Sequence, residues 1–292
     1  MTANDAPADP LVSIIIAAYG APEAMHATLG SLIAHTADPC EIIVVDSGVE
    51  DCKGVQEIAE AFPVTYIQVP NGGFAAASNA GIRRARAPFL VLLNPDVVLH
   101  DDAIGRLVRL LQRDSRIGCA GPQLRRPNGS AQPYAFGTEP RPWFLLSRGL
   151  KRLAAMRHGL EGISERLGTQ PIAVDWVAGT CLVTREDVLK AVGLLDERYF
   201  LYWEDVDWCL RVRKHGWRVV LDPGVMVTHV GGASTGATAS AHYYRSLVEF
   251  YRKWYGDRWA LLLTMLLRIY APLVGIIRRR RWAATENREA RL

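Results

Sequence analysis

Three carboxylates fall within four positions of the run WEDVDW, at the start of a predicted helix. Glu204, Asp205 and Asp207 crowd like charges together, which raises a carboxyl pKa and makes a better general base. Acidic residues also suit the positive N-terminal end of a helix, which is the structural alternative. We expect the apolar, core-facing side of this helix to consist of Val206, Cys209 and Leu210. Asp205 and the neighbouring tryptophans are then free to point elsewhere.

Other polar side chains follow apolar runs that we predict as strands. The carboxylate of Asp46 closes EIIVVD and could bind a nucleobase or ribose hydroxyl, although an Asp at this place is also an ordinary turn former. Asn94-Pro95-Asp96 follows LVLL, and Asp96 offers a hard oxygen ligand for Mg²⁺ or Mn²⁺ beside a diphosphate, unless the tripeptide is only a turn. A lone histidine is usually structural, but His229 precedes a glycine-containing segment, which strengthens the case for a ligand.

The segment NGGFAAASNAG, residues 71–81, is unusually rich in small side chains and enters a predicted helix. Small residues let a diphosphate or ribose approach the backbone, and a helix N-terminus favours anions. A tight loop with close packing of helix on sheet is the alternative. The glycine spacing departs from G-x-G-x-x-G, so it does not indicate a dinucleotide site.

The elements that must position these groups alternate in the first 120 residues. Short apolar runs predict strands at Val12–Ala18, Glu41–Asp46, Thr65–Val69 and Phe89–Asn94. Helical patterns lie between them, at Pro22–His35, Gly54–Ala61 and Phe74–Ala85. This βαβα order predicts an α/β fold, a mostly parallel doubly wound sheet with helices on both faces. Ligands bind beyond the carboxyl ends of such strands, at Tyr19, Asp46 and residues 94–96 here.

A second block of elements begins near Trp176. It is predicted to comprise a strand, two helices and two short strands separated by a turn: Val177–Thr184, Arg185–Val192, Glu204–His215, Trp217–Leu221 and Val225–His229. The second helix is expected to end at Gly216 with a left-handed cap. Between the blocks, Arg125–Asp175 is interrupted by prolines and then turns basic, and we expect a mobile insertion that carries specificity.

Composition limits the class of protein. The 292 residues are 49% hydrophobic and 22% charged, which excludes a disordered or disulfide-stapled chain. The net charge of +4 equals that of the last 15 residues, which hold six Arg and two Glu, so the remainder is neutral. A neutral body excludes a broadly basic nucleic-acid binder. The five scattered cysteines indicate buried thiols in a reducing compartment, and the acidic N-terminus lacks the pattern of a secretory signal.

The segment from Ala260 to Ile277 is apolar apart from Arg268 and is followed by four arginines at 278–281. We expect it to lie on a membrane surface, because an apolar segment and a polybasic patch together supply the two signals that stable anchoring needs. A transmembrane span and a core helix with a solvated basic end are the alternatives. We therefore expect a cytoplasmic protein held at the inner face of the cell membrane.

Taken in order, these pieces resemble the family 2 inverting glycosyltransferases with the nucleotide-diphospho-sugar (GT-A) fold, especially the bacterial rhamnosyltransferase-like branch. The matching stretches are Val12–Tyr19, Ile42–Gly48, Asn71–Gly81, Leu92–Val98, Trp176–Thr184, Gly193–Arg213 and Val227–Ser234. The resemblance implies transfer of a sugar, with rhamnose favoured, from a nucleoside diphosphate to a saccharide or lipid-linked saccharide in cell-surface polysaccharide synthesis. The donor it implies is dTDP-rhamnose or a UDP-sugar.

On the donor side, the resemblance implies that Tyr19 and Asp46 contact the base and ribose. It also implies that Gly73 and Asn79 belong to the segment that holds the nucleotide. Within that segment, Ala77 stands where the family usually has glycine, which tightens the loop against the ligand.

On the catalytic side, Asp96 stands at the last position of the family's D-x-D metal motif and would hold a Mg or Mn cation together with His229. Asn94 replaces the first acid of that motif, so the site has fewer charges. Asp205 matches the base that removes the acceptor hydroxyl proton in a single inverting displacement, and Glu204 would orient the acceptor.

These expectations divide the chain into four parts: a disordered N-terminus (1–10), a nucleotide-sugar-binding half (11–124), an acceptor-binding and catalytic half (125–238) and C-terminal helices (239–292). Two other functions compete with sugar transfer. A sugar nucleotidyltransferase usually has a basic glycine-rich loop where this chain has AAYGAP. A catalytically inactive membrane-surface scaffold of the same fold should have lost Asp96 or Asp205, and both are present.

Overall fold

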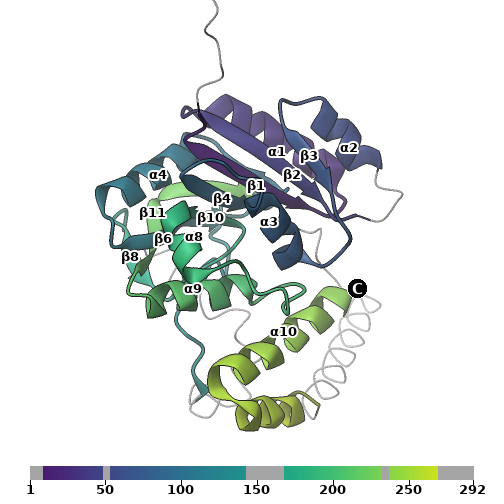
Figure 1. Cartoon of the computed structure of the whole chain (residues 1–292), viewed down its shortest axis with the longest axis vertical. Helices are drawn as coiled ribbons and strands as arrows, with labels where there is room; N and C mark the ends of the chain where they lie inside the picture. Colours follow the sequence, from purple (N-terminus) through teal and green to yellow (C-terminus); the bar gives the residue numbers. More distant parts are fainter. Residues whose placement is uncertain (1–8, 49–52, 143–167, 232–236, 269–292) are drawn as a thin grey trace, which may run out of the picture.

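The computed structural model describes residues 9–48, 53–142, 168–231 and 237–268 (Figure 1). A mixed sheet of nine strands forms its centre, in the order β3-β2-β1-β4-β10-β6-β11-β5, with β8 pairing with β11. The strands are β1 (Val12–Ala18), β2 (Cys40–Asp46), β3 (Thr65–Gln68), β4 (Phe89–Leu93), β5 (Val97–Val98), β6 (Ile117–Arg125), β8 (Ile172–Val174), β10 (Cys181–Arg185) and β11 (Arg218–His229). A smaller sheet pairs β7 (Phe136–Gly137) with β9 (Trp176–Val177).

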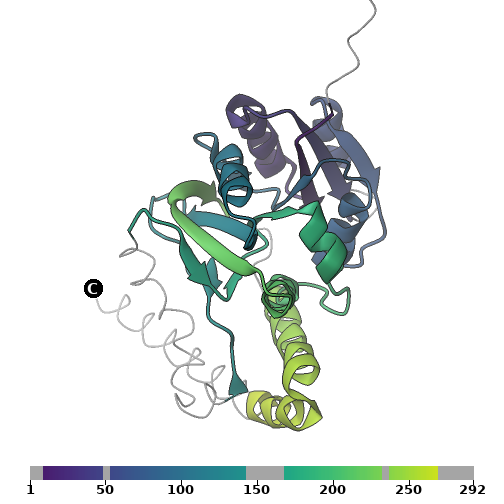
Figure 2. The same cartoon turned by 60° about the vertical axis from the view of Figure 1, so that its left-hand side comes forward.

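Helices cover both faces of the large sheet. The helices are α1 (Pro22–His35), α2 (Lys53–Glu60), α3 (Phe74–Ile82), α4 (Ala103–Arg113), α8 (Glu186–Val192), α9 (Glu204–Lys214) and α10 (Ala237–Tyr255). Figure 2 shows α1 and α4 on one side of the sheet and α3, α8 and α9 on the other. The predicted doubly wound α/β architecture is therefore confirmed.

The first strands lie in parallel and end at one edge. Ala18 of β1 is in register with Asp46 of β2, and Ile16 of β1 is in register with Leu93 of β4. Every residue of β4 is buried, and consecutive apolar residues are expected in a strand that is covered on both faces. This register brings the ends of β1, β2 and β4 together at the carboxyl edge.

Two predicted strand patterns in the second block were wrong. Val177–Thr184 is not one strand, because residues 178–180 form a turn between β9 and the antiparallel strand β10. Trp217–Leu221 and Val225–His229 are not two strands, because β11 runs through both as one strand. Its pairing with β6 shifts register between Asp222 and Met226, and this bulge accommodates Pro223, which has no N–H for the ladder.

α10 and the helical residues 257–268 form a smaller second core with α9. It is built mainly from aromatic and leucine side chains, among them Tyr199, Trp203, Leu210, Leu247, Phe250, Tyr251 and Leu263. Figures 1 and 2 show these C-terminal helices extending away from the sheet. Within the residues that the structure describes, no helix is long and apolar enough to cross a membrane.

Several expectations fall on residues outside the described ranges: most of the N-terminus, the centre of the insertion, residues 232–234, and the C-terminal segment beyond Arg268 with its arginines.

Cys119, Cys181 and Cys209 are buried as predicted, whereas Cys40 is exposed at the start of β2, against the prediction. Gly216 follows α9 with a φ of 92°, which confirms the left-handed cap.

Candidate active site

Tyr19 directly follows β1 and Asp46 ends β2, so both lie at the carboxyl edge of the sheet. The Asp46 side chain is buried; its Oδ1 accepts a hydrogen bond from Gly48 N at 2.8 Å, and its Oδ2 accepts one from the Tyr66 hydroxyl at 2.9 Å. The Tyr19 side chain is 56% exposed. The backbone N–H of Ser47 donates to Ala18 O at 3.0 Å, so the two predicted base and ribose contacts lie on adjoining chain segments. Their contact with a nucleotide stays a prediction.

The small-residue segment docks on the loop that precedes α9. Gly73 has a φ of 87°, and a Cβ at that position would lie 2.0 Å from Phe200 O. The adjacent N–H of Phe74 donates to the same carbonyl at 2.8 Å. Gly81 packs so closely on β1 and β2 that a Cβ would lie 2.4 Å from Ile15 Cγ2. Close packing therefore accounts for two of the glycines, and nucleotide binding by Gly73 stays a prediction.

Asn79 links the same two segments. Its Nδ2 donates to Leu195 O at 2.9 Å and to Glu197 Oε1 at 2.8 Å, while its Oδ1 accepts a hydrogen bond from Leu195 N at 3.0 Å. The side chain is buried. Asn79 thus ties α3 to residues 193–203, a role that sequence reasoning did not find, and its contact with a nucleotide stays a prediction.

Asp96 and His229 meet although 133 positions separate them in the sequence. His229 Nε2 lies 3.1 Å from Asp96 Oδ1, and Gly231 N donates to Asp96 Oδ2 at 3.1 Å. The pairing of β11 with β5 places His229 opposite Val97, which explains why the two side chains meet. Both side chains are largely shielded from solvent, with exposures of 13% for His229 and 7% for Asp96.

The chemistry of this pair fits a divalent cation. His229 Nδ1 lies 2.8 Å from Gln132 Oε1, and an amide oxygen there favours the tautomer with its proton on Nδ1. Nε2 then presents a lone pair next to a carboxylate oxygen, which suits a shared cation. Within the described ranges, no three His, Cys, Asp or Glu side chains gather as a metal site. Since Mg²⁺ usually takes one or two carboxylates and completes its shell with phosphates and waters, two protein ligands suffice.

The acid pair Glu204-Asp205 opens α9 after two strained residues. Tyr202 and Trp203 have φ values of 67° and 75°, in the left-handed region that side chains other than glycine rarely adopt. Asp205 Oδ2 accepts a hydrogen bond from Gly179 N at 2.8 Å, and Oδ1 accepts one from Val206 N at 2.8 Å. Strain immediately before a polar pair is typical of functional sites.

The turn between β9 and β10 links the segment of Asp205 to the segment of Asp96. Gly179 N donates to the Asp205 carboxylate, and the next residue, Thr180, accepts a hydrogen bond from Asn94 N at 3.0 Å. Asn94 stands two positions before Asp96. The predicted base and the predicted cation ligands therefore lie along one edge, linked by two consecutive residues.

Burial sets the protonation of the acid pair. Desolvation raises the pKa of Glu204 well above its usual range, and the charge of Asp205 raises that pKa further. Glu204 Oε2 is buried without a hydrogen-bond partner, which agrees with a neutral carboxyl group. Desolvation also raises the pKa of Asp205, although the N–H groups of Gly179 and Val206 partly oppose that shift. The arrangement holds one neutral acid beside one carboxylate of increased basicity.

Replacing Glu204 with Gln is expected to stabilise the protein at neutral and alkaline pH. The folded-state pKa of Glu204 lies above the ordinary value of 4.5, so the unfolded chain ionises first as pH rises and folding loses stability. Gln removes this loss, and below pH 4.5 the advantage should vanish because both states of the native chain are protonated. Melting temperatures of both proteins between pH 4 and 9 would check this, and a constant difference would contradict it.

The third acid and the second tryptophan of the run do not face the site. Asp207 is fully buried, and Trp208 is buried with its Nε1 donating to Gly193 O at 2.9 Å. The expectation that the tryptophans point away from the core was therefore wrong. Trp203, which directly precedes α9, and Trp208, within α9, pack in the two different cores.

A family model described as "Glycosyltransferase like family 2" matches residues 7–245. Among curated proteins, the N-acetylglucosaminyl-diphospho-decaprenol L-rhamnosyltransferase of Mycobacterium tuberculosis is 27% identical over 309 aligned positions, which cover 93% of this chain and 95% of the relative. The O-antigen biosynthesis protein RfbC of Myxococcus xanthus is 26% identical over 85% of this chain, which spans only 20% of that protein.

Solved structures agree on the fold. A mannosyltransferase from Pyrobaculum calidifontis, solved with GDP-Man and Mn²⁺, superposes with a TM-score of 0.55 at 18% identity and covers 85% of this chain, which spans 65% of that structure. GalNAc-T7, solved with UDP, GalNAc and Mn²⁺, gives a TM-score of 0.60 at 16% identity and covers 86% of this chain, which spans 49% of that structure. With sheet order, family model and relatives in agreement, the chain belongs to glycosyltransferase family 2 and is a glycosyltransferase with the GT-A fold.

Proposed function

We propose that this glycosyltransferase transfers a sugar, with rhamnose favoured, from dTDP-rhamnose or a UDP-sugar to a saccharide or lipid-linked saccharide with inversion at the anomeric carbon. The observation that supports this proposal is the backbone link between the two groups: Gly179 bonds to Asp205, and the next residue, Thr180, bonds to Asn94, two positions before Asp96, which contacts His229. A relative named for L-rhamnosyl transfer and for N-acetylglucosaminyl-diphospho-decaprenol supports this sugar and a lipid-linked acceptor.

In this mechanism Asp205 accepts the proton of the acceptor hydroxyl while that oxygen attacks the anomeric carbon from the face opposite the leaving group. The Gly179 and Val206 N–H groups hold the carboxylate in place without neutralising it. Asp96 and His229 would hold the cation, which when bound supplies positive charge to the departing diphosphate. Tyr19 and Asp46 would bind the nucleoside. Glu204, neutral and buried, would orient the acceptor.

The test is release of nucleoside diphosphate from dTDP-rhamnose and from UDP-sugars, with a synthetic N-acetylglucosaminyl-diphospho-prenol as acceptor. We expect release that requires the acceptor and Mg²⁺ or Mn²⁺ and that stops with EDTA. In parallel, the nucleoside diphosphate with Mn²⁺ should raise the melting temperature, because it binds only the folded state. Binding without turnover on any donor would favour an inactive scaffold, and release of pyrophosphate from a nucleoside triphosphate and a sugar phosphate would favour a nucleotidyltransferase.

We further propose that the C-terminal helices seat the protein on the inner, cytoplasmic face of the cell membrane. Support comes from the exposed apolar side chains of Leu261, Leu262 and Met265, and from the apolar and arginine-rich sequence that follows them. Replacing Leu261 and Met265 together with Glu should reduce sedimentation with anionic phospholipid vesicles. Ile33→Glu, at an exposed apolar position on α1, is the matched control. Equal sedimentation of all three proteins would refute this seating.

A further inference from the structure

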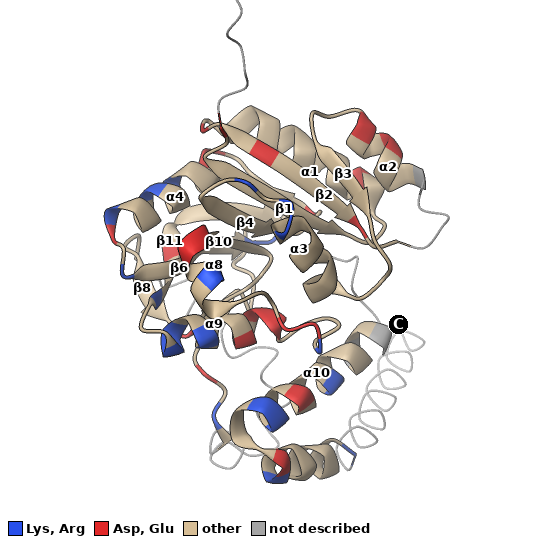
Figure 3. Cartoon of the chain, viewed as in Figure 1, with Lys and Arg blue, Asp and Glu red and all other residues tan. Residues whose placement is uncertain are grey.

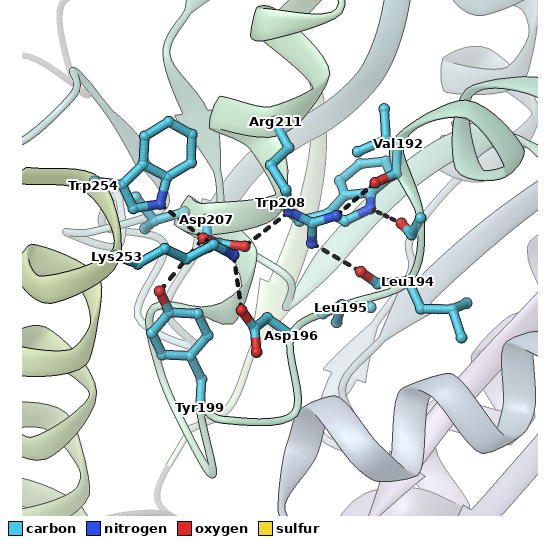
Figure 4. Close-up of polar contacts among 12 residues, drawn as sticks. Val192, Leu194, Leu195, Asp196, Tyr199, Asp207, Trp208, Arg211, Lys253 and Trp254 are labelled. Atoms are coloured by element: carbon cyan, nitrogen blue, oxygen red, sulfur yellow. Dashed lines mark hydrogen bonds and ion pairs between the residues drawn. The ribbon is translucent and has the colours of Figure 1, made fainter.

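Asp207 is the centre of a buried polar network on the side of α9 away from Asp205. Its Oδ1 accepts hydrogen bonds from Trp254 Nε1 at 2.7 Å and from the Tyr199 hydroxyl at 3.4 Å. Lys253 Nζ lies 2.7 Å from the same oxygen, and Arg211 Nε donates to Oδ2 at 2.9 Å. Figure 4 shows these side chains converging on Asp207 from α9, from α10 and from the loop before α9. The Asp207 carboxylate thus has protein partners on both oxygens.

The network also secures the loop of residues 193–203. Lys253 Nζ donates to Asp196 Oδ2 at 2.8 Å, so one ammonium group bridges the loop and α9 (Figure 4). Arg211 donates to Val192 O and to Leu194 O, both at 2.8 Å. Cations and carboxylates alternate through the network. Along α9 itself, the acidic residues lie at the start and the basic residues at the end (Figure 3). Such an order complements the helix dipole.

α10 has further polar contacts beyond this network. Ser246 Oγ donates to Leu201 O at 2.9 Å, next to the left-handed residues Tyr202 and Trp203. Further along α10, the hydroxyl of Tyr251 donates to Pro140 O at 2.8 Å. A strained backbone persists only where its surroundings overdetermine it, and α10 supplies those surroundings. The strain directly precedes Glu204 and Asp205.

Helix geometry connects this network with the site. Residues two apart on an α-helix point in directions that differ by about 200°, so Asp205 and Asp207 project from nearly opposite sides of α9. Fixing Asp207 therefore fixes the rotation of α9 about its axis, and with it the direction of Asp205. Asp207 is fully buried, and a buried carboxylate with several charged partners can specify one arrangement of the groups around it even where it adds little stability.

We infer that Lys253 and Trp254 of α10, acting through Asp207, are positioning residues for the proposed base Asp205. The inference rests on the proposed function, since it assigns the base to Asp205. α10 therefore takes part in transfer without touching the substrate: it holds the first turn of α9 so that the Asp205 carboxylate meets the acceptor hydroxyl.

The test compares Lys253→Met, Lys253→Arg and Trp254→Phe in the full chain. Lys253→Met removes the ammonium group but keeps most of the stem, and Trp254→Phe removes the indole N–H donor. Because a misplacement of about 1 Å can reduce catalysis about 100-fold, we expect kcat to fall by about 10- to 100-fold in both variants. The KM for the donor should change by less than about twofold, and Lys253→Arg should recover most of kcat.

The matched control is Lys190→Met, which breaks an exposed ion pair with Glu186 on α8 and should leave kcat unchanged. Assays run well below each melting temperature separate misplacement from unfolding. Unchanged kcat in Lys253→Met and Trp254→Phe, or a kcat loss equal to the unfolded fraction, would overturn the inference. Failure of the proposed function has a different signature: either the native protein would release no nucleoside diphosphate, or, if only the base assignment is wrong, Asp205→Asn would retain transfer.

Discussion

Replacing Asp205 with Asn is expected to lower kcat for transfer by about 10²- to 10⁴-fold, the range for loss of a general base. Asn is nearly isosteric and keeps one oxygen for the N–H of Gly179, which the Asp205 carboxylate accepts at 2.8 Å, while only the bond from the Val206 N–H to the other oxygen is lost. The fold and donor binding should therefore survive while the proton acceptor is lost. Steady-state rates of nucleoside diphosphate release, with the donor dissociation constant measured by titration, give both quantities.

The same assay has a control and a pH signature. Asp187 lies in the first turn of α8 and pairs with Arg185 at 2.9 Å, so Asp187→Asn removes a comparable acid away from the site and should leave kcat unchanged. In the native protein, kcat should fall tenfold per pH unit below the pKa of Asp205, which burial places above the ordinary 3.8. Transfer by Asp205→Asn at a rate close to native would refute the assignment of the base.

Asp96→Asn is expected to lower kcat by about 10²- to 10³-fold, the loss typical of removing one electrostatic contact to charge that develops in the transition state. The variant keeps an oxygen for the N–H of Gly231, which donates to Asp96 Oδ2 at 3.1 Å, but it loses the carboxylate beside His229. Binding of Mn²⁺ in the presence of nucleoside diphosphate should weaken in parallel, as followed by electron paramagnetic resonance.

Asp101→Asn serves as the comparison for this variant, because Asp101 pairs at the surface with Arg106 at 3.1 Å and lies only five positions along the chain. It should bind Mn²⁺ and turn over as the native protein does. If Asp96→Asn kept native Mn²⁺ affinity in the ternary mixture, the cation site would have to lie elsewhere.

Local patterns predicted the first strands and helices of the fold well. Val12–Ala18 and Pro22–His35 have the predicted bounds in the structure, because an apolar run between turn signals and a proline at the helix start are local properties. The edge at which Tyr19, Asp46 and Asp96 lie follows from the parallel order alone.

Long-range contacts escaped prediction. β6 and α4 were not assigned from the sequence, and the course of β11 was wrong, since its continuity depends on pairing with β6. The partners of Asp207 could not be found from its neighbours, because Lys253 and Trp254 come from a helix more than 40 positions away. Crowded acids at a helix start predict charge repulsion, but whether each acid faces a substrate or a lysine is decided by tertiary packing.

The strand order has a consequence for recombining relatives of this chain. β10, from the second half of the sequence, lies between β4 and β6, and β11 lies between β6 and β5. Cutting the chain between the halves would expose the long apolar edges of β4 and β6, which invite aggregation. Chimaeras that exchange donor or acceptor preference should therefore swap loops at the carboxyl edge rather than whole halves, and leave the interleaved strands from a single parent.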